Sequence, residues 1–464
     1  MRDCRRWGLW LTLSLVVTLP GAPITAQADE PVASLKVQAD QGEPLPARVT
    51  LISPGQPYPD LAVFFTDAKG RCALRDAPDG ECTLQVDHGP EWSIERIPVT
   101  IDKARGRTLT VPLKRLYDLK SHGYYQGDCH MHSTASDGKQ SPADVAFHCR
   151  CEGLDFAFIT DHETIEGHGE YMSQAVEGFL PLGGQEITTS HGHILGLGVT
   201  QVVSRDVSRG ALDMARIFQQ VREQSAVSVV AHPMVPTMSY VHWSVDDYDA
   251  IEILNGSAPP YAGLFDMVQA RLKWHALLND GKRVPALGNS DNHDNYNGIV
   301  RRALQNPEAA IKRDPRMGLL WSMPNRDEVI IPWAMKGLFI GTYRTCLKLD
   351  SLAQTPILDA IRAGRGFVTN GPIVVVTAND TDPGGEVRGT SATLCYDAAC
   401  NRGLHHLAIV ADGEIVQSVD LRDKTRAQGE INLDLRDITW FTVECYGTWP
   451  EFATTNAFYV DAQQ

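Results

Sequence analysis

Two histidines separated by one residue, His130 and His132, stand in the segment 127–138, whose sequence is GDCHMHSTASDG. Residues two apart on a β-strand point to the same side, so one metal ion can use both imidazoles without a bend in the backbone. Twelve of the 15 histidines lie between His122 and His293. Because histidine is the commonest metal ligand in proteins, this clustering predicts a multinuclear metal centre rather than a single ion.

Further motifs place a histidine or a carboxylate after a short apolar run. Runs of this kind, such as 156–159 and 227–230, are typical of buried strands. Barrels of alternating strands and helices place their chemistry at the C-terminal ends of the strands, and we interpret each candidate ligand as lying just past such an end. The motifs are Thr160-Asp161-His162, Gln185-Glu186, His191-Gly192-His193, Ala231-His232-Pro233 and Ser290-Asp291-Asn292-His293.

Residues 118–376, which carry these motifs, alternate between strand and helix patterns, as in a barrel or a parallel sheet. Ser141 is a good N-cap for a first helix, and Gly153 closes it. Residues 300–340 contain several Pro, Arg and Trp residues without a clear period, and we interpret them as a lid or substrate wall. The other expected elements are strands at 156–159, 227–230, 251–254 and 284–287, and helices at 212–224 and 265–279.

The two flanking regions have a different pattern. Residues 29–117 alternate apolar and polar positions with a turn about every ten residues, which predicts a small β-sandwich. Residues 377–464 are again rich in strand patterns, and a closing β-sandwich is expected there. A chain of 464 residues is long enough for two or three domains, which agrees with this division.

Residues 1–28 are typical of a secretory signal peptide. A basic start precedes an apolar run over 7–19, which is too short to span a bilayer, and Ala26-Gln27-Ala28 is a small-x-small cleavage site. We therefore expect a secreted or periplasmic protein that has no membrane span after signal cleavage. An uncleaved N-terminal anchor is the alternative.

The formal net charge of −15 argues against nonspecific nucleic-acid binding, which relies on Lys and Arg to neutralise phosphates. It leaves room for a small anionic substrate, because bound cations invert the field locally. The sequence contains neither G-x-S-x-G nor a P-loop motif. No motif therefore indicates a serine hydrolase or a nucleotide kinase. We expect a small-molecule ester substrate, and the sequence leaves the oligomeric state open.

The ordered set GDCHMHSTASDG, GLDFAFITDH, GGQEI, GHILGLG, AHP, GNSDNH, GTYRT and AGRGFVTNGP resembles the PHP superfamily (polymerase and histidinol phosphatase), and specifically its secreted CehA/McbA-type branch. The resemblance covers about 122–376. It implies a distorted (β/α)7 barrel with up to three metals and hydrolytic chemistry, often on phosphate esters. The region 29–117 resembles the carboxypeptidase-regulatory-like sandwiches that precede catalytic domains in secreted hydrolases.

The resemblance also assigns ligands, position by position, to three metals. It implies a first metal on His130, His132, Glu186 and Asp291, with Glu186 bridging to a second metal. The second metal would be held by His193 and His232, and the resemblance favours His193 over His191. The third would be held by Asp137, His162 and His293.

Metal ions at such positions would explain the chemistry without a protein nucleophile. Two cations bridged by Glu186 can share a water, which loses a proton near neutral pH and attacks the ester as hydroxide. Glu186 and Asp291 are therefore candidate catalytic residues. Arg344, in Gly341-Thr342-Tyr343-Arg344-Thr345, is our candidate for clamping an anionic substrate, with a loop-stabilising role as the alternative.

The neighbours of the candidate ligands have other expected roles. Cys129 lies between metal-motif residues on a strand, so its side chain should point away from His130 and His132. Asp161 is interpreted as a partner that orients an imidazole rather than as a ligand.

Three questions stay open in the sequence. The resemblance includes a branch that cleaves aryl carbamate esters, and attack by a metal-activated water suits a carbonyl as well as phosphorus. A noncatalytic, metal-binding surface module is a third reading. The expected two to three divalent ions could be zinc, manganese or iron, because His and carboxylate ligands accept all of them.

Overall fold

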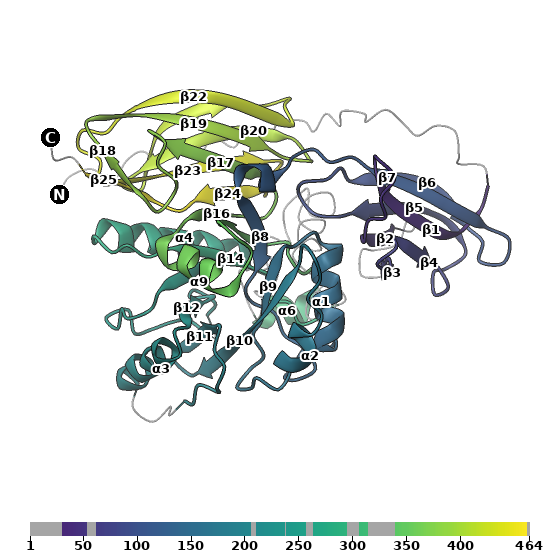
Figure 1. Ribbon diagram of the computed structural model, residues 1–464, viewed down its shortest axis with the longest axis horizontal. Helices are drawn as coiled ribbons and strands as arrows, with labels where there is room; N and C mark the ends of the chain where they lie inside the picture. Colours follow the sequence, from purple (N-terminus) through teal and green to yellow (C-terminus); the bar gives the residue numbers. More distant parts are fainter. Residues whose placement is uncertain are drawn as a thin grey trace.

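In Figure 1 the C-terminal strands (green to yellow) lie above the central strands and helices, and the N-terminal strands (purple) lie to one side. The predicted signal peptide and most of the predicted lid at 300–340 lie outside the described residues. The structure is a computed structural model that describes residues 30–52, 62–205, 210–236, 238–256, 263–294, 306–313 and 339–461.

The N-terminal part is a sheet of seven strands in the order β3-β2-β5-β6-β1-β4, with β7 paired to β1. Its alternating sequence explains its single core: on β7, Leu109, Val111 and Leu113 are buried while the residues between them are exposed. Six strands form one hydrogen-bonded path and β7 branches from β1. The sheet confirms the strand-rich character of this region, and its division into the two layers of a β-sandwich stays a prediction. The strands are β1 Val32–Ala39, β2 Arg48–Ile52, β3 Ala62–Phe65, β4 Arg71–Ala73, β5 Gly80–Asp87, β6 Glu95–Ile101 and β7 Arg107–Leu113.

The central part places seven strands, β8 to β14, side by side in chain order. Most are buried along their whole length, as expected for strands covered on both faces. Backbone hydrogen bonds from His132 N to Asn292 O (2.9 Å) and from Asp291 N to His130 O (2.8 Å) join the segments that follow β8 and β14. The strands are β8 Tyr124–Asp128, β9 Phe156–Ile159, β10 Leu180–Thr189, β11 Gly192–Leu197, β12 Val227–Ala231, β13 Ala250–Asn255 and β14 Ala286–Asn289.

Helices cover the outside of these strands (Figure 1). The predicted cap of the first helix is confirmed, because the Ser141 hydroxyl accepts a hydrogen bond from the Asp144 amide at 3.1 Å. In α3 the buried Met214, Phe218 and Val221 follow helical spacing and form one core with Ile251 of β13. The helices are η2 Leu119–His122 (3-10), α1 Pro142–Cys151, α2 His168–Met172, α3 Ala211–Glu223, α4 Gly263–Asn279, α6 Pro307–Arg313 and α9 Gln354–Ala363.

One central strand departs from the predicted alternation of strand and helix. β11 is antiparallel to both of its neighbours, β10 and β12, whereas the other pairs within β8–β14 are parallel. It follows β10 through a short turn at Ser190 and His191, without an intervening helix. The start of β11 therefore lies at the same edge of the sheet as the ends of the parallel strands.

Most of the C-terminal strands continue the central sheet, whereas β17, β19 and β22 form a separate sheet of three strands that shares an apolar core with β20 and β23. The closing β-sandwich at 377–464 stays a prediction. β15 (Arg344–Lys348) pairs with β8, and β16 (Gly366–Thr369) pairs with both β15 and β24. The predicted boundary at 376/377 falls inside β17 (Ile373–Ala378). The other strands are β18 Glu386–Arg388, β19 Ser391–Ala399, β20 Leu404–Ala411, β21 Glu414–Asp420, β22 Arg426–Asp434, β23 Trp440–Gly447, β24 Phe452–Thr455 and β25 Phe458–Asp461.

Candidate metal centre

The candidate ligands come from six places along the central strands and meet at one edge of the sheet. His130 and His132 follow β8, His162 follows β9, and His232 follows β12. Asp291 and His293 follow β14, as predicted. Two ligands differ from the prediction: Glu186 lies inside β10, and His193 lies near the start of β11. His193 lies at the same edge because β11 runs antiparallel to its neighbours. Glu186 lies there because it pairs, beyond the end of β9, with His162.

Glu186 is the centre of the arrangement. One of its carboxylate oxygens, Oε2, lies 3.0 Å from His130 Nε2 and 3.1 Å from His132 Nε2. The other oxygen, Oε1, lies 2.7 Å from His193 Nδ1 and 3.1 Å from His232 Nε2. His162 Nδ1 also lies 3.4 Å from Oε2, and His162, Glu186 and His193 form a further candidate ligand group. Each oxygen therefore faces at least two imidazoles, as a carboxylate must if it bridges two cations.

Asp291 completes the first of these two groups. Its Oδ1 lies 3.1 Å from His132 Nε2 and 3.3 Å from His130 Nε2. His130, His132, Glu186 and Asp291 each offer a ligand atom, and these atoms all lie within 4.8 Å of one another. The structure thus brings together the four residues that the sequence grouped around a first metal. We call these four, with His193 and His232, the inner cluster.

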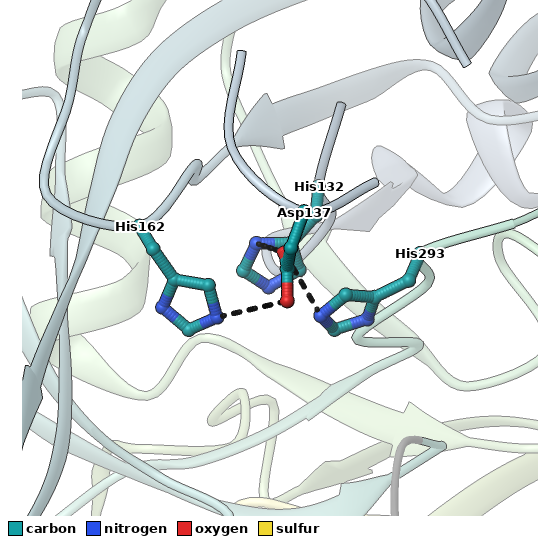
Figure 2. Close-up of side chains that lie close together, drawn as sticks. All are labelled: His132, Asp137, His162 and His293. Atoms are coloured by element: carbon teal, nitrogen blue, oxygen red, sulfur yellow. Dashed lines mark ion pairs between the residues drawn. The ribbon is translucent and has the colours of Figure 1, made fainter. Parts of the chain in front are cut away.

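A second group surrounds Asp137, which Figure 2 shows between the rings of His162 and His293. Its carboxylate lies 3.4 Å from His293 Nε2 and 3.8 Å from His162 Nε2. His132 Nδ1 lies 3.8 Å away as well, so this group contains one histidine more than predicted. We call His132, Asp137, His162 and His293 the outer cluster.

The two clusters differ in exposure. The side chains of His130, His132, Glu186 and Asp291 are at most 3% exposed. In the outer cluster, His162 is 23% exposed, His293 27% and Asp137 57%. The inner cluster is therefore closed to bulk water, and the outer cluster lies at its mouth. Together the clusters indicate more than one metal site.

The residues fit divalent ions. Two donor atoms that bind one ion at about 2.1 Å lie about 3.0–3.4 Å apart for ligand angles of about 90–110°, close to the nitrogen–oxygen distances around Glu186. Within the described part of the chain, the Nδ1 atoms of His132 and His232 are buried without a hydrogen-bond partner. Buried polar atoms are rarely left unpaired. Here the two unpaired atoms belong to histidines that lie among the other candidate metal ligands.

The pKa shifts in the inner cluster show that its buried carboxylates need positive charge beside them. Burial alone would raise the pKa of Glu186, but His130 and the other imidazoles hold that pKa well below its usual range. Burial would lower the pKa of His132, yet its hydrogen bonds to Asp291 and Glu186 raise it to about 9. In the outer cluster, burial lowers the pKa of His162 to about 4. Buried carboxylates of this kind must be balanced by protons or by metal ions.

Glu252 on β13 orients the inner cluster and was not singled out from the sequence. It is fully buried, and its carboxylate lies 3.0 Å from His130 Nδ1. It also accepts hydrogen bonds from the His232 amide (2.7 Å) and from Asn289 Nδ2 (2.7 Å). A carboxylate behind a ligating imidazole fixes the orientation of the ring. The one sequence feature that could have identified Glu252 is its position as an acidic residue inside the apolar run 251–254.

The backbone is strained at two ligands. His232 has φ of 26° and Asp291 has φ of 50°, values that are uncommon for residues other than glycine. His232 directly follows β12 and Asp291 lies two residues beyond β14, and this geometry is maintained only where the surroundings enforce it. Strain at two candidate ligands marks this edge as a functional site.

Arg344, predicted to clamp the substrate, does not belong to either cluster. It is buried, and its guanidinium donates to Gln126 Oε1 (3.1 Å) and to the Glu152 carbonyl (2.7 Å). Its neighbour Thr345 directs its hydroxyl to Gly288 of β14. Because side chains alternate along a strand, Arg344 must point to the opposite face. In this structure Arg344 joins β15 to Gln126 of β8 and to the end of α1, away from both clusters. Its clamping of an anionic substrate stays a prediction that these contacts do not favour.

Asp161 also has a role that differs from its prediction, since its carboxylate accepts hydrogen bonds from Ser133 and Ser136 rather than from an imidazole. Cys129 does point away from the clusters, into an apolar core, as predicted. Of the two histidines around Gly192, His193 reaches Glu186, whereas the ring of His191 lies 4.7 Å from that of His242.

No family model matches the sequence. An uncharacterized protein of Methanocaldococcus jannaschii is 26% identical over 144 residues, which cover 28% of this chain and 81% of that protein. The fold is similar to a two-domain protein of Bacteroides vulgatus that contains a predicted PHP-like metal-dependent phosphoesterase, with a TM-score of 0.40, 16% identity, and coverage of 70% of this chain and 90% of that one. It is also similar to an amidohydrolase of Chromobacterium violaceum with bound sulfate, with a TM-score of 0.29, 17% identity, and coverage of 39% and 96%.

Proposed function

We propose that this protein is an exported, metal-dependent hydrolase that cleaves phosphate esters, and that it belongs to the CehA/McbA-type branch of the PHP superfamily. The observation that carries the proposal is the carboxylate of Glu186, each oxygen of which faces at least two imidazoles. The order of the motifs along the chain supports the family, and the seven consecutive strands β8 to β14 support a distorted (β/α)7 barrel.

The residues divide the work as follows. Two divalent ions, when bound, would supply an activated water and neutralise the charge that develops on the ester. Glu186 would hold the two ions close together, and Asp291 with His130 and His132 would fix one of them. His193 and His232 would fix the other. Glu252 would keep the His130 ring in place and fix which nitrogen carries its proton.

The number and kind of ions follow from the ligands. Two ions in the inner cluster and one in the outer cluster would give three, and occupation of the inner cluster alone would give two. Imidazole and carboxylate donors suit zinc, manganese and iron. Cys129, which lies between the segments that carry the ligands, packs in the apolar core and is not a candidate ligand.

The second candidate function is hydrolysis of aryl carbamates or carboxyl esters at the same centre. The observation that favours it is the position of Arg344, the predicted clamp for an anionic substrate, whose contacts lie away from both clusters. A neutral ester needs no such clamp. The sequence-based proposals of export and of a small-molecule substrate apply to both candidates. Within the described residues, no helix has the length and apolar composition needed to cross a bilayer.

The test compares substrates on the metal-loaded protein. We expect an aryl phosphate monoester or a phosphate diester to be cleaved faster than an aryl carbamate. Replacing His130 and His132 by Ala should abolish turnover while the circular dichroism spectrum stays unchanged. The matched control is His405→Ala, which alters an exposed histidine of β20. Preference for the carbamate would favour the second candidate, and no turnover with metal bound would favour a noncatalytic module.

A further inference from the structure

Asp161 lies between β9 and the outer-cluster residue His162 and is 2% exposed. Its Oδ1 accepts hydrogen bonds from the Ser133 amide (2.7 Å) and the Ser136 hydroxyl (2.6 Å). Its Oδ2 accepts a third from the Ser133 hydroxyl (2.7 Å). All three donors belong to the turn 133–138, which starts directly after His132 and contains Asp137. The buried carboxylate of Asp161 therefore ties this turn to the segment between β9 and His162.

The turn 133–138 is a compact unit. The amides of Ser136 and Gly138 donate to the Ser133 carbonyl at 3.1 and 2.9 Å, and the Ala135 amide donates to the Ser133 hydroxyl at 3.1 Å. A Cβ on Gly138 would lie 2.6 Å from the carbonyl group of His132, so the close approach requires glycine. The turn thus fixes where Asp137 lies once Ser133 itself is fixed.

Asp137 depends on this turn because its own carboxylate is 57% exposed. The histidines that it faces at 3.4–3.8 Å are themselves candidate ligands and do not anchor it to the core. Exposed ion pairs of this kind contribute little to holding a side chain in position. The three hydrogen bonds to buried Asp161 are charge-assisted and short, and such bonds are the strong ones.

We infer that Asp161 is the positioning residue of the outer cluster: it anchors the turn 133–138 and so holds Asp137 between His162 and His293. The inference rests on the proposed function, because it takes the outer cluster to be a metal site. The inner cluster shares only His132 with the outer cluster, and the Asp161 carboxylate bonds Ser133 and Ser136 rather than the His132 ring. Glu186 and Asp291 are held by β10 and by the segment after β14, so the inner cluster keeps its two carboxylates without this contact. Loss of Asp161 therefore empties the outer site and leaves the inner site filled.

The experiment measures metal content and affinity. Wild-type protein and Asp161→Ala are loaded with Mn²⁺, and bound metal per chain is determined by elemental analysis and titration calorimetry. We expect Asp161→Ala to lose one equivalent, or to bind it about 10–100-fold more weakly, and to keep the inner equivalents. The matched control is Asp144→Ala. It removes an exposed carboxylate on α1 that accepts a hydrogen bond from the Ser141 hydroxyl, and this variant should bind metal like the wild type.

A double variant tests whether Asp161 acts through Asp137. If it does, Asp137→Ala combined with Asp161→Ala should bind the outer ion no more weakly than Asp137→Ala alone. An additive loss would overturn the inference. If Asp161→Ala does not fold, Ser136→Ala decides the question, because it removes one of the three hydrogen bonds and should weaken only the outer site.

The outcomes separate this inference from the proposed function. A wild-type chain that binds no divalent ion contradicts both. A wild-type chain that binds only the inner ions overturns the inference and leaves the proposed function intact. Full occupancy in folded Asp161→Ala, or loss of inner and outer metal together, also overturns it.

Discussion

The inner and outer clusters use the same residue types but are supported in different ways. Inner ligands such as Glu186 and Asp291 stand in or directly beyond buried strands, and Glu252 supports His130 from behind. Asp137 of the outer cluster stands on a turn, half-exposed, and depends on hydrogen bonds made by Asp161 to that turn. Ligands in or next to buried strands are thus held in place by the sheet itself. A ligand on an exposed turn needs additional hydrogen bonds that fix the turn.

The two clusters also differ in their demand for charge. Inner carboxylates are buried and share their imidazoles, so positive charge at this place, from protons or from metal ions, stabilises the fold. The Asp137 carboxylate has water on one side, so solvent already compensates part of its charge. We therefore expect the inner ions to contribute to folding and catalysis, and the outer ion to be more readily exchanged.

The largest expected effect comes from removing the shared carboxylate. Glu186→Gln should abolish binding of at least one inner ion and reduce turnover by more than the roughly 100-fold that follows loss of a supporting residue. Asp137→Asn should cost less, because it affects only the outer cluster. Elemental analysis and initial rates check both variants. Equal losses in the two variants would contradict the division into inner and outer sites.

A smaller effect is expected behind the inner cluster. Glu252→Gln removes the charge that orients His130 and should weaken inner metal binding by about 10–100-fold. Titration with a competing chelator measures this change. Glu223→Gln on α3 is the matched control, since Glu223 is exposed and lies at the end of that helix. An unchanged inner affinity in Glu252→Gln would show that the His130 ring is fixed by packing alone.

Removal of metal should proceed in two phases. On addition of excess chelator, about one equivalent should leave first, because Asp137, His162 and His293 are open to solvent. The inner equivalents should follow more slowly, and activity should decline with the slow phase. Stopped-flow detection with a chromophoric chelator checks the order. A single phase would argue that the clusters form one cooperative site.

The smallest effect concerns the pH dependence of the metal-free fold. The pKa of His132 is raised to about 9, so its contribution to stability is full below the ordinary pKa of about 6.5 and is lost as the pH rises through 9. The pKa of His162 is lowered to about 4, so its contribution is lost as the pH falls from 6.5 towards 4. Metal-free protein should therefore melt at its highest temperature near pH 6.5. A melting temperature that rises steadily from pH 6.5 to 9 would contradict this assignment.

Sequence reasoning located the ligands because their motifs have local causes. His130 and His132 alternate with core residues on one extended segment, and His232 and Asp291 directly follow apolar runs. These patterns depend on strand geometry, which a single segment reveals. The structure accordingly brings these residues to one edge of the sheet.

The missed features depend on contacts between distant segments. The reversed direction of β11 follows from its pairing with β10 and β12, which no local pattern shows. Arg344 points away from the clusters because Thr345 packs against β14, and the motif alone does not say which of the two faces inward. Glu252 and Asp161 gained their roles only when their partners, more than 20 residues away in the chain, came next to them.

The most direct test of the central claim is the rate at which one chain, stripped of metal and then reloaded, cleaves an aryl phosphate ester. The account predicts no turnover after stripping and full recovery when two equivalents of Mn²⁺ or Zn²⁺ fill the inner cluster. A rate that survives stripping, or that stays absent from a folded chain with two bound equivalents, would contradict it.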